Sequence, residues 1–450
     1  MPVALVLLAA FMLASVGGRY SWPSVPALFA ASALFLVSGA RLGSDAATRG
    51  LNVILAACLG FIAFQLTPLP SRLLNTISPA TSHLYDAYAL LDAGAWRPLS
   101  IDPAATRAGL ILALTAALVF WAAREAFSHG GSRAATRLLA IIGLACGFIS
   151  LSQHATAPGT VLWHWTVADP RATPFGPFVD RNQLATWLVL AISVVAGSLM
   201  MHVARRRREN WRRGIRAAIV LLGDGLGVIL SGCLIVMLLT LVATLSRSGL
   251  IALLAAVVIG TSLSRRDHRR TAWTGVAAAA ALVVLAVWVN AEGFAQRVMT
   301  SIAAAPPEAV GRLTIWRDTL RVIRDFPVFG TGIGTFAEAM FVYQQSARQV
   351  LFNHAHNEYL QIAAEGGLLL LTFVVAGVMV LAWAARRALA EDTSTYRYVR
   401  IGACAGLTAI AVQSVWETGL RAPANLVLAA ILAGMALANR VQPDSETFVV

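Results

Sequence analysis

The stretch "FNHAHNEYLQIAAEGG" (Phe352–Gly367) runs directly into an apolar segment that continues to residue 385. A helix needs about 20 mainly apolar residues to cross a bilayer. The sequence therefore predicts a membrane-crossing helix whose entrance carries histidines, asparagines and glutamates. Polar groups are costly inside a membrane, so a cluster of them at a helix entrance points to chemistry at that surface.

The composition extends this prediction to the whole chain. Hydrophobic residues make up 58% of the 450 residues and charged residues only 13%, and the mean hydropathy is +0.70. One water-soluble core cannot bury so many apolar side chains. Windows of membrane-crossing length predict an all-α polytopic protein of about twelve transmembrane helices, near residues 3–17, 24–40, 51–66, 107–123, 138–154, 184–202, 226–245, 249–263, 272–290, 368–385, 401–416 and 423–438.

The placement of arginine predicts the orientation of these helices. All 35 basic residues are arginine, and most of them fall in the connections on one side of the predicted spans. Basic residues are enriched in cytoplasmic connections, so both termini are predicted to lie in the cytoplasm. Attraction to lipid headgroups then explains the net charge of +13 without nucleic acid as a partner.

The chain is predicted to form a single membrane domain over 1–450, with a long outer loop over 291–367 between predicted spans nine and ten. Long loops in compact folds tend to be functional. The loop segment "GRLTIWRDTLRVIRDFP" has helical periodicity and predicts an amphipathic helix that lies on the outer leaflet and stops at Pro327. Its apolar side chains are Leu313, Trp316, Leu320 and Ile323, and its arginines are Arg317, Arg321 and Arg324.

Four polar groups fall on the outer side in this topology. They are "FGPFVDRNQLA" (175–185), "LSRSG" (245–249), "GRLTIWR" (311–317) and "NHAHNEYLQ" (353–361). Arg247 lies between two serines where two apolar helices meet, and a guanidinium there needs an anionic partner or access to solvent. The planar guanidinium fits phosphate oxygens two at a time. Arg181, Arg312 and Arg317 are predicted to converge on the same anion, although each one alone is weak evidence.

The histidines favour acid–base chemistry over metal binding. His354 and His356 would point about 200° apart on a helix and so could share a ligand only in an extended chain. No cysteine or carboxylate stands at zinc-ligand spacing, so no metal is predicted. A histidine at the mouth of a span can act as a general base. Asn353 and Asn357 could cap the helix, and Glu358 or Glu365 could orient an imidazole ring.

Two further patterns leave alternatives open. The glycines of "FPVFGTGIGTF" (326–336) suit either a phosphate-binding backbone or a plain turn. The aromatic side chains of "VLWHWTVADP" (161–170) suit either stacking on sugar rings or an ordinary interfacial belt.

Taken in order, these parts resemble the O-antigen ligase and polymerase superfamily of bacterial envelopes. The resemblance rests on the arginine between serines, on "GR" with a Trp four residues after the Arg, on "P..G.G.G.F" and on "HAHN.YLQ....EGG". It covers about 175–371. Two positions depart from the family pattern: Asp180 stands where Asn is common, and Leu370 stands where ligases tend to have a second glycine.

The resemblance implies a GT-C-like, metal-independent, inverting glycosyltransferase of the bacterial inner membrane that needs no cofactor. Such an enzyme would move a glycan from an undecaprenyl-pyrophosphate carrier to an acceptor hydroxyl at the periplasmic face. The acceptor would be lipid A core for a ligase, a growing chain for a polymerase, or a protein hydroxyl. The Leu370 departure slightly favours a repeat-unit polymerase over a lipid A ligase.

Carried over residue by residue, the resemblance places the catalytic roles on His356, Arg247 and Arg312. The predicted substrate-binding residues are Arg181, Arg317, Asn182, His354 and Asn357. Two other classes of protein stay open on the sequence: a transporter of a small anion such as bicarbonate, and a non-catalytic scaffold of envelope assembly. Transporters place ionisable groups near the bilayer midplane, whereas the distinctive polar groups here are predicted at one surface.

Overall fold

The computed structural model describes residues 1–40, 46–88, 96–167, 172–210, 224–264, 312–345 and 351–439. Within these ranges the protein is almost entirely helical, and strands are confined to two short antiparallel hairpins. The long helices are α1 (Pro2–Ala14), α2 (Ser24–Ser38), α3 (Ala46–Gln65), α6 (Pro103–Ser128), α7 (Ser132–Thr156), α8 (Arg181–Asn210), α10 (Gly225–Ala243), α11 (Arg247–Leu263), α16 (Glu358–Glu391), α17 (Arg397–Gln413) and α18 (Pro423–Leu437). The shorter elements are η1 (Val16–Gly18), α4 (Ser71–Ile77), α5 (Pro79–Tyr88), α14 (Arg312–Asp325), α15 (Phe336–Tyr343), η3 (Gly419–Arg421) and strands β1 (Leu69–Pro70), β2 (Trp96–Arg97), β3 (Thr160–Val161) and β4 (Trp165–Thr166).

The predicted spans overlap helices along the described chain. Six helices there are long and apolar enough to cross a membrane: α3, α6, α7, α8, α10 and α16. Helices α1, α2, α11 and α18 are shorter but also apolar. The predicted span at 272–290, and residues 291–311 of the predicted outer loop, lie outside the described residues. The structure is therefore that of a multi-pass, all-α membrane protein.

Helix α8 forms the centre of the bundle. In its most apolar window 83% of the residues are buried, against 17% in α16 at the periphery. A Cβ on Gly402 of α17 would collide with the backbone oxygen of Ser193 on α8, and one on Gly197 of α8 would collide with the backbone of Tyr398. Small residues allow this close approach, which is how membrane helices gain packing energy without a hydrophobic driving force between them.

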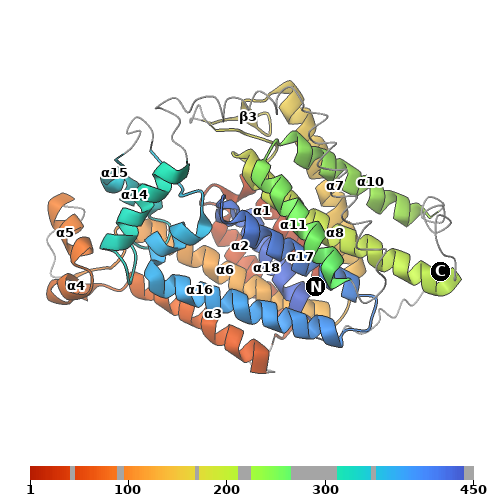
Figure 1. Ribbon diagram of the computed structural model, residues 1–450, viewed down its shortest axis with the longest axis horizontal. Helices are drawn as coiled ribbons and strands as arrows, with labels where there is room; N and C mark the ends of the chain where they lie inside the picture. Colours follow the sequence, from red (N-terminus) through yellow and green to blue (C-terminus); the bar gives the residue numbers. More distant parts are fainter. Residues whose placement is uncertain are drawn as a thin grey trace.

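A small group of helices covers one end of the bundle. Helices α4, α5, α14 and α15 gather there, beyond the ends of the long helices (Figure 1). Helices α5, α14 and α15 share an apolar cluster that includes Leu84, Val322, Phe336, Met340 and Ala364, and α4 packs in a neighbouring cluster through Leu74. We call this the site end, because the predicted site residues lie beside it.

The amphipathic helix predicted in the outer loop is present as α14, but its predicted apolar stripe is divided. Leu313 and Leu320 are exposed, as a face toward lipid would require. Trp316 instead donates from Nε1 to the backbone oxygen of Ala355 at 3.0 Å, and Ile323 packs against the apolar cluster. The helix is therefore held by the protein along one side, and its position on the outer leaflet stays a prediction.

Helix α16 is interrupted at Gly367. This residue has φ 65° and ψ 179°, a region of backbone conformation that is nearly restricted to glycine. The interruption leaves backbone groups without helical partners, and the preceding loop supplies two donors and one acceptor. Thr331 N donates to Ala364 O at 3.0 Å, Gly332 N to Glu365 O at 2.9 Å, and Leu368 N to Pro327 O at 2.8 Å. The "EGG" sequence thus separates a short helix at the site end from the membrane part of α16.

The glycine-rich loop (326–336) packs so closely against the protein that a side chain at two of its glycines would collide with neighbouring atoms. A Cβ on Gly330 would meet the backbone at Glu365, and one on Gly332 would meet Ser100 and Thr106. Gln65 of α3 fixes the loop further, since its Nε2 donates to the Phe329 oxygen at 2.7 Å. Of the two interpretations of these glycines, the turn is the one that the structure supports.

Candidate active site

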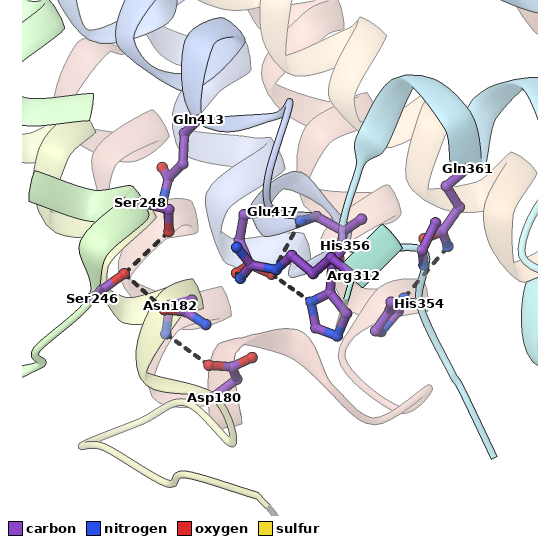
Figure 2. Close-up of polar contacts among 12 residues, drawn as sticks. Asp180, Asn182, Ser246, Ser248, Arg312, His354, His356, Gln361, Gln413 and Glu417 are labelled. Atoms are coloured by element: carbon purple, nitrogen blue, oxygen red, sulfur yellow. Dashed lines mark hydrogen bonds and ion pairs between the residues drawn. The ribbon is translucent and has the colours of Figure 1, made fainter. Parts of the chain in front are cut away.

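The candidate site lies where five segments meet at the site end. These are the start of α8, the turn between α10 and α11, the start of α14, the start of α16 and the connection from α17 to α18 (Figure 2). The predicted residues His356, Arg312 and Asn182 come from three of these segments and approach one another through intervening polar side chains. Hydrogen bonds between these segments therefore position most of the site.

Glu417 is the centre of this arrangement, and the sequence reasoning missed it. Its Oε1 lies 3.2 Å from Nδ1 of His356, and its Oε2 accepts from Arg312 Nη2 at 3.3 Å. The Glu417 side chain is 3% exposed, whereas His356 and Arg312 remain 34% and 41% exposed. One buried carboxylate thus orients both an imidazole and a guanidinium that stay accessible to a substrate.

The backbone around His356 is fixed on both sides. His356 has φ 48°, in the left-handed region that side chains with a Cβ adopt rarely. Ala355 accepts from Trp316 and donates its backbone N–H to Gln361. Asn357 caps α16, since its side-chain oxygen accepts from Leu360 N at 3.0 Å. The cap predicted for Asn357 is confirmed, and the same oxygen is thereby occupied within the protein.

Arg247 begins α11 directly after the tight turn. Leu245 has φ 53°, and Ser246 caps α11 by accepting from Gly249 N at 3.2 Å. Ser246 also donates to Asn182 Oδ1 at 2.7 Å, and Ser248 accepts from Gln413 at 3.3 Å. The two serines therefore tie the turn to α8 and α17, and Arg247 is left exposed between them.

The start of α8 brings a second carboxyl group to the site. Asp180 Oδ1 accepts from the backbone N–H of Asn182 at 2.7 Å. Burial raises the pKa of Asp180, and the nearby Glu417 raises it further, while the Asn182 N–H, His356 and Arg181 oppose this shift. The carboxyl group of Asp180 therefore interacts electrostatically with Glu417, His356 and Arg181. Asp180, which stands where Asn is common in the family, thus adds an acidic group to the site.

His354 belongs to a neighbouring cluster. Its Nδ1 lies 3.4 Å from Gln361 Nε2. Burial lowers the pKa of His354 to about 3, and the positive charges of Arg421 and Arg19 and the nearby His356 act in the same direction. His354 is therefore neutral at physiological pH, beside the imidazole of His356.

The two glutamates expected to orient a histidine bind an arginine instead. Arg421 donates to Glu358 at 2.7 Å and to Glu365 at 2.6 Å, and Glu365 is 1% exposed. The expectation that Glu358 or Glu365 orients an imidazole is wrong for His356, because Glu417 holds that place. The reason is that α16 turns Glu365 inward toward η3, while His356 precedes the helix.

Arg317 is exposed on α14, five residues after Arg312. Among the described residues, no three histidine, cysteine or carboxylate side chains are grouped as metal ligands. What the site presents is positive charge around an accessible imidazole, with carboxylates that orient both.

A comparison with protein-family models matches residues 232–375 to the family described as O-antigen ligase. This part of the chain belongs to the O-antigen ligase and polymerase superfamily. The O-antigen ligase match includes Arg247, Arg312 and His356, whereas Asp180, Glu417 and Arg421 lie outside the matched range. A comparison with curated proteins gives no match. The O-antigen ligase match supports a membrane enzyme of the O-antigen ligase or polymerase type.

Proposed function

We propose that the protein is a metal-independent, inverting glycosyltransferase. It transfers a glycan from an undecaprenyl-pyrophosphate carrier to an acceptor sugar hydroxyl at the periplasmic face of the inner membrane. The observation that supports this most is the bridge from His356 through Glu417 to Arg312. It joins a candidate base to a candidate phosphate-binding group in one accessible site.

His356 is the proposed general base. In this proposal Nδ1–H of His356 donates a hydrogen bond to the carboxylate of Glu417, so that Nε2 carries the lone pair. Nε2 takes the proton of the acceptor hydroxyl while the hydroxyl oxygen attacks the anomeric carbon. The bond from that carbon to the pyrophosphate oxygen breaks on the opposite face, so the configuration inverts.

The arginines are the proposed anion-binding groups. The pyrophosphate gains negative charge as it leaves, and fixed positive charge in a partly dehydrated site stabilises that change. Arg312 is proposed to bind the pyrophosphate together with Arg247 and Arg181, which lie at the starts of α11 and α8. Arg317 extends the positive surface along α14. Asn182 and His354 are proposed to contact the sugars, His354 as a neutral hydrogen-bonding group.

The proposal predicts that His356→Ala lowers glycan transfer at least about 100-fold, the usual loss when a general base is removed. The assay uses purified full-length protein with an undecaprenyl-pyrophosphate-linked glycan, and mass spectrometry follows the product. Binding of the carrier should persist, because the arginines remain. His164→Ala, in the exposed hairpin turn, is the matched control. Transfer by His356→Ala at a near wild-type rate would overturn the proposed role.

The envelope glycans of a deletion strain separate the remaining alternatives. Single repeat units indicate a polymerase, which is the outcome we expect. Lipid A with core alone indicates a ligase. Unaltered glycans together with altered solute uptake would instead support an anion transporter.

A further inference from the structure

A cavity of about 310 Å³ lies at the opposite end of the bundle from the candidate site. It is formed where α7 and α10 begin and α8 nears its end, and its lining includes Arg133 and Arg137 of α7, Arg205 and Arg206 of α8, and Asp224 before α10. Its volume is at the lower end of the range for small-molecule sites. The residues of the candidate active site take no part in it.

The lining of the cavity is strongly basic. Among the described residues it contains four arginines and one carboxylate, Asp224. Asp224 contacts His202 Nε2 and accepts from Arg206 Nη2 at 2.9 Å. Burial opposes ionisation of Asp224, but the hydrogen bonds from His202 and Arg206 outweigh it and hold its pKa below the usual range. The described lining of the cavity thus carries more positive than negative groups, which suits an anionic ligand.

The side chains are held partly by the protein itself. Arg205 donates from Nε to Thr395 Oγ1 at 3.0 Å, which fixes the guanidinium of α8 against the start of α17. The hydroxyl groups of Ser198 and Thr136 are hydrogen-bonded at 2.9 Å, which joins α8 to α7 at the cavity. Preorganised guanidinium groups bind phosphate oxygens with less loss of side-chain freedom.

The cavity is also apolar on one side. Met201, Leu226 and Leu230 line it, and Val228 and Ile229 on the adjoining surface of α10 are exposed. A ligand with a phosphate and a hydrocarbon part would satisfy both sides. The position at the ends of membrane-crossing helices matches the level of lipid headgroups.

We propose that this cavity binds the phosphate of an anionic phospholipid, whose acyl chains lie along the apolar surface of α10. In the proposed topology this lipid belongs to the cytoplasmic leaflet. If the arginines only anchored the helix ends to the membrane surface, any arginine at that level would contribute equally. If the cavity is a specific lipid site, the arginines that line it contribute more than the others.

The test measures lipid binding to purified full-length protein in detergent by native mass spectrometry. Phosphatidylglycerol, phosphatidylethanolamine and inorganic phosphate are titrated separately. We expect phosphatidylglycerol to bind preferentially, and Arg137→Gln to weaken its binding about tenfold, the effect of losing one charge-assisted hydrogen bond. Arg133→Gln should act in the same way.

Arg386→Gln is the matched control, because Arg386 is exposed near the same end of the bundle but lies on α16, away from the cavity lining. An equal loss in Arg137→Gln and Arg386→Gln would overturn the site in favour of general anchoring. Binding of inorganic phosphate that displaces the lipid, with no preference for phosphatidylglycerol, would overturn the lipid assignment. Arg137→Lys shows whether a loss of binding comes from misfolding. It keeps the positive charge and should lose only part of the affinity for phosphatidylglycerol.

Discussion

His356 shows how the backbone selects the direction of a side chain. Its φ of 48° costs on the order of 1–3 kcal/mol for a residue with a Cβ. The extended segment before it and the Asn357 cap after it hold this conformation. The ring then points to Glu417 rather than along α16. Strain of this kind is typical of residues that contribute to function.

Glu417 is predicted to position His356 rather than to contact the substrate. Glu417→Gln should lower kcat on the order of 100-fold, because the neutral amide no longer favours the proton on Nδ1 or stabilises the protonated ring. The measurement is steady-state transfer by the purified protein, with a thermal melt to show that the variant is folded.

Glu417→Asp keeps the charge and should recover part of kcat, which a purely structural role would not require. Glu391→Gln, on the exposed end of α16, serves as the control carboxylate. Equal rates for the Gln and Asp variants would contradict the positioning role.

The lowered pKa of His354 predicts that the folded protein loses stability as the pH falls. Its pKa of about 3 in the folded protein lies below the ordinary value of 6.5. Below pH 6.5 the unfolded chain therefore binds a proton that the folded protein does not, and stability falls until the pH nears 3. His354→Gln should reduce the drop in melting temperature between pH 7 and pH 5. His164→Gln should leave that drop unchanged, and an equal change in both variants would contradict the assignment.

At the scale of elements, the interruption of α16 accounts for the "EGG" sequence. The break at Gly367 is possible because the loop from Phe326 to Gly334 provides backbone donors to the interrupted turn. Leu370, one of the departures from the family pattern, is 3% exposed and packs with Phe61 and Ile62 of α3. Leucine, which is larger than the glycine that ligases tend to have here, therefore fills space between α16 and α3.

Gly367→Ala is predicted to destabilise the protein strongly. An added Cβ would overlap the backbone oxygen of Val328, in a conformation that is already unsuitable for alanine. Gly39→Ala is the comparison variant: Gly39 also has a φ of 65°, but its ψ of 24° is left-handed helical and no atom lies within 4 Å of the added Cβ. Thermal unfolding in detergent should show a clearly larger loss for Gly367→Ala. Similar losses in the two variants would mean that neither the extended ψ of Gly367 nor its contact with the loop matters.

For the whole molecule, hydropathy and turn residues were sufficient to predict most of the helices. Apolar runs of membrane length become helices because a bilayer leaves backbone groups no other partners. Cap residues such as Ser246 and Asn357 then mark where helices begin. The proximity of the polar groups at one end also follows, because each is adjacent to the end of a span.

The pairings between these groups could not be predicted in the same way. Glu417 is 61 positions from His356 and 105 from Arg312, and no local pattern joins them. A usable signal was present in the connection "SVWETGLRA" (414–422), which places Glu417 and Arg421 between two apolar spans. Which carboxylate binds which cation depends on how α16, α17 and η3 pack, and this is a tertiary property.

The proposed orientation can be tested by cysteine labelling. The four native cysteines are first replaced by serine, and Trp163→Cys or Arg386→Cys is then introduced. Trp163 lies in the exposed β3–β4 turn near the site end, and Arg386 lies near the other end of the bundle. A membrane-impermeant maleimide should label Trp163→Cys in intact spheroplasts and Arg386→Cys only after permeabilisation. The reverse pattern would place the candidate site in the cytoplasm.

The interruption at Gly367 has a mechanical consequence. The lipid-facing part of α16 will tilt when the hydrocarbon thickness of the bilayer changes, but the rotation can be absorbed at the glycine. The segment before it is bound to Gln65, to the loop and to Arg421. We therefore expect the imidazole and its carboxylate to keep their separation in thin and thick bilayers alike, so that the chemistry is insulated from deformation of the surrounding lipid.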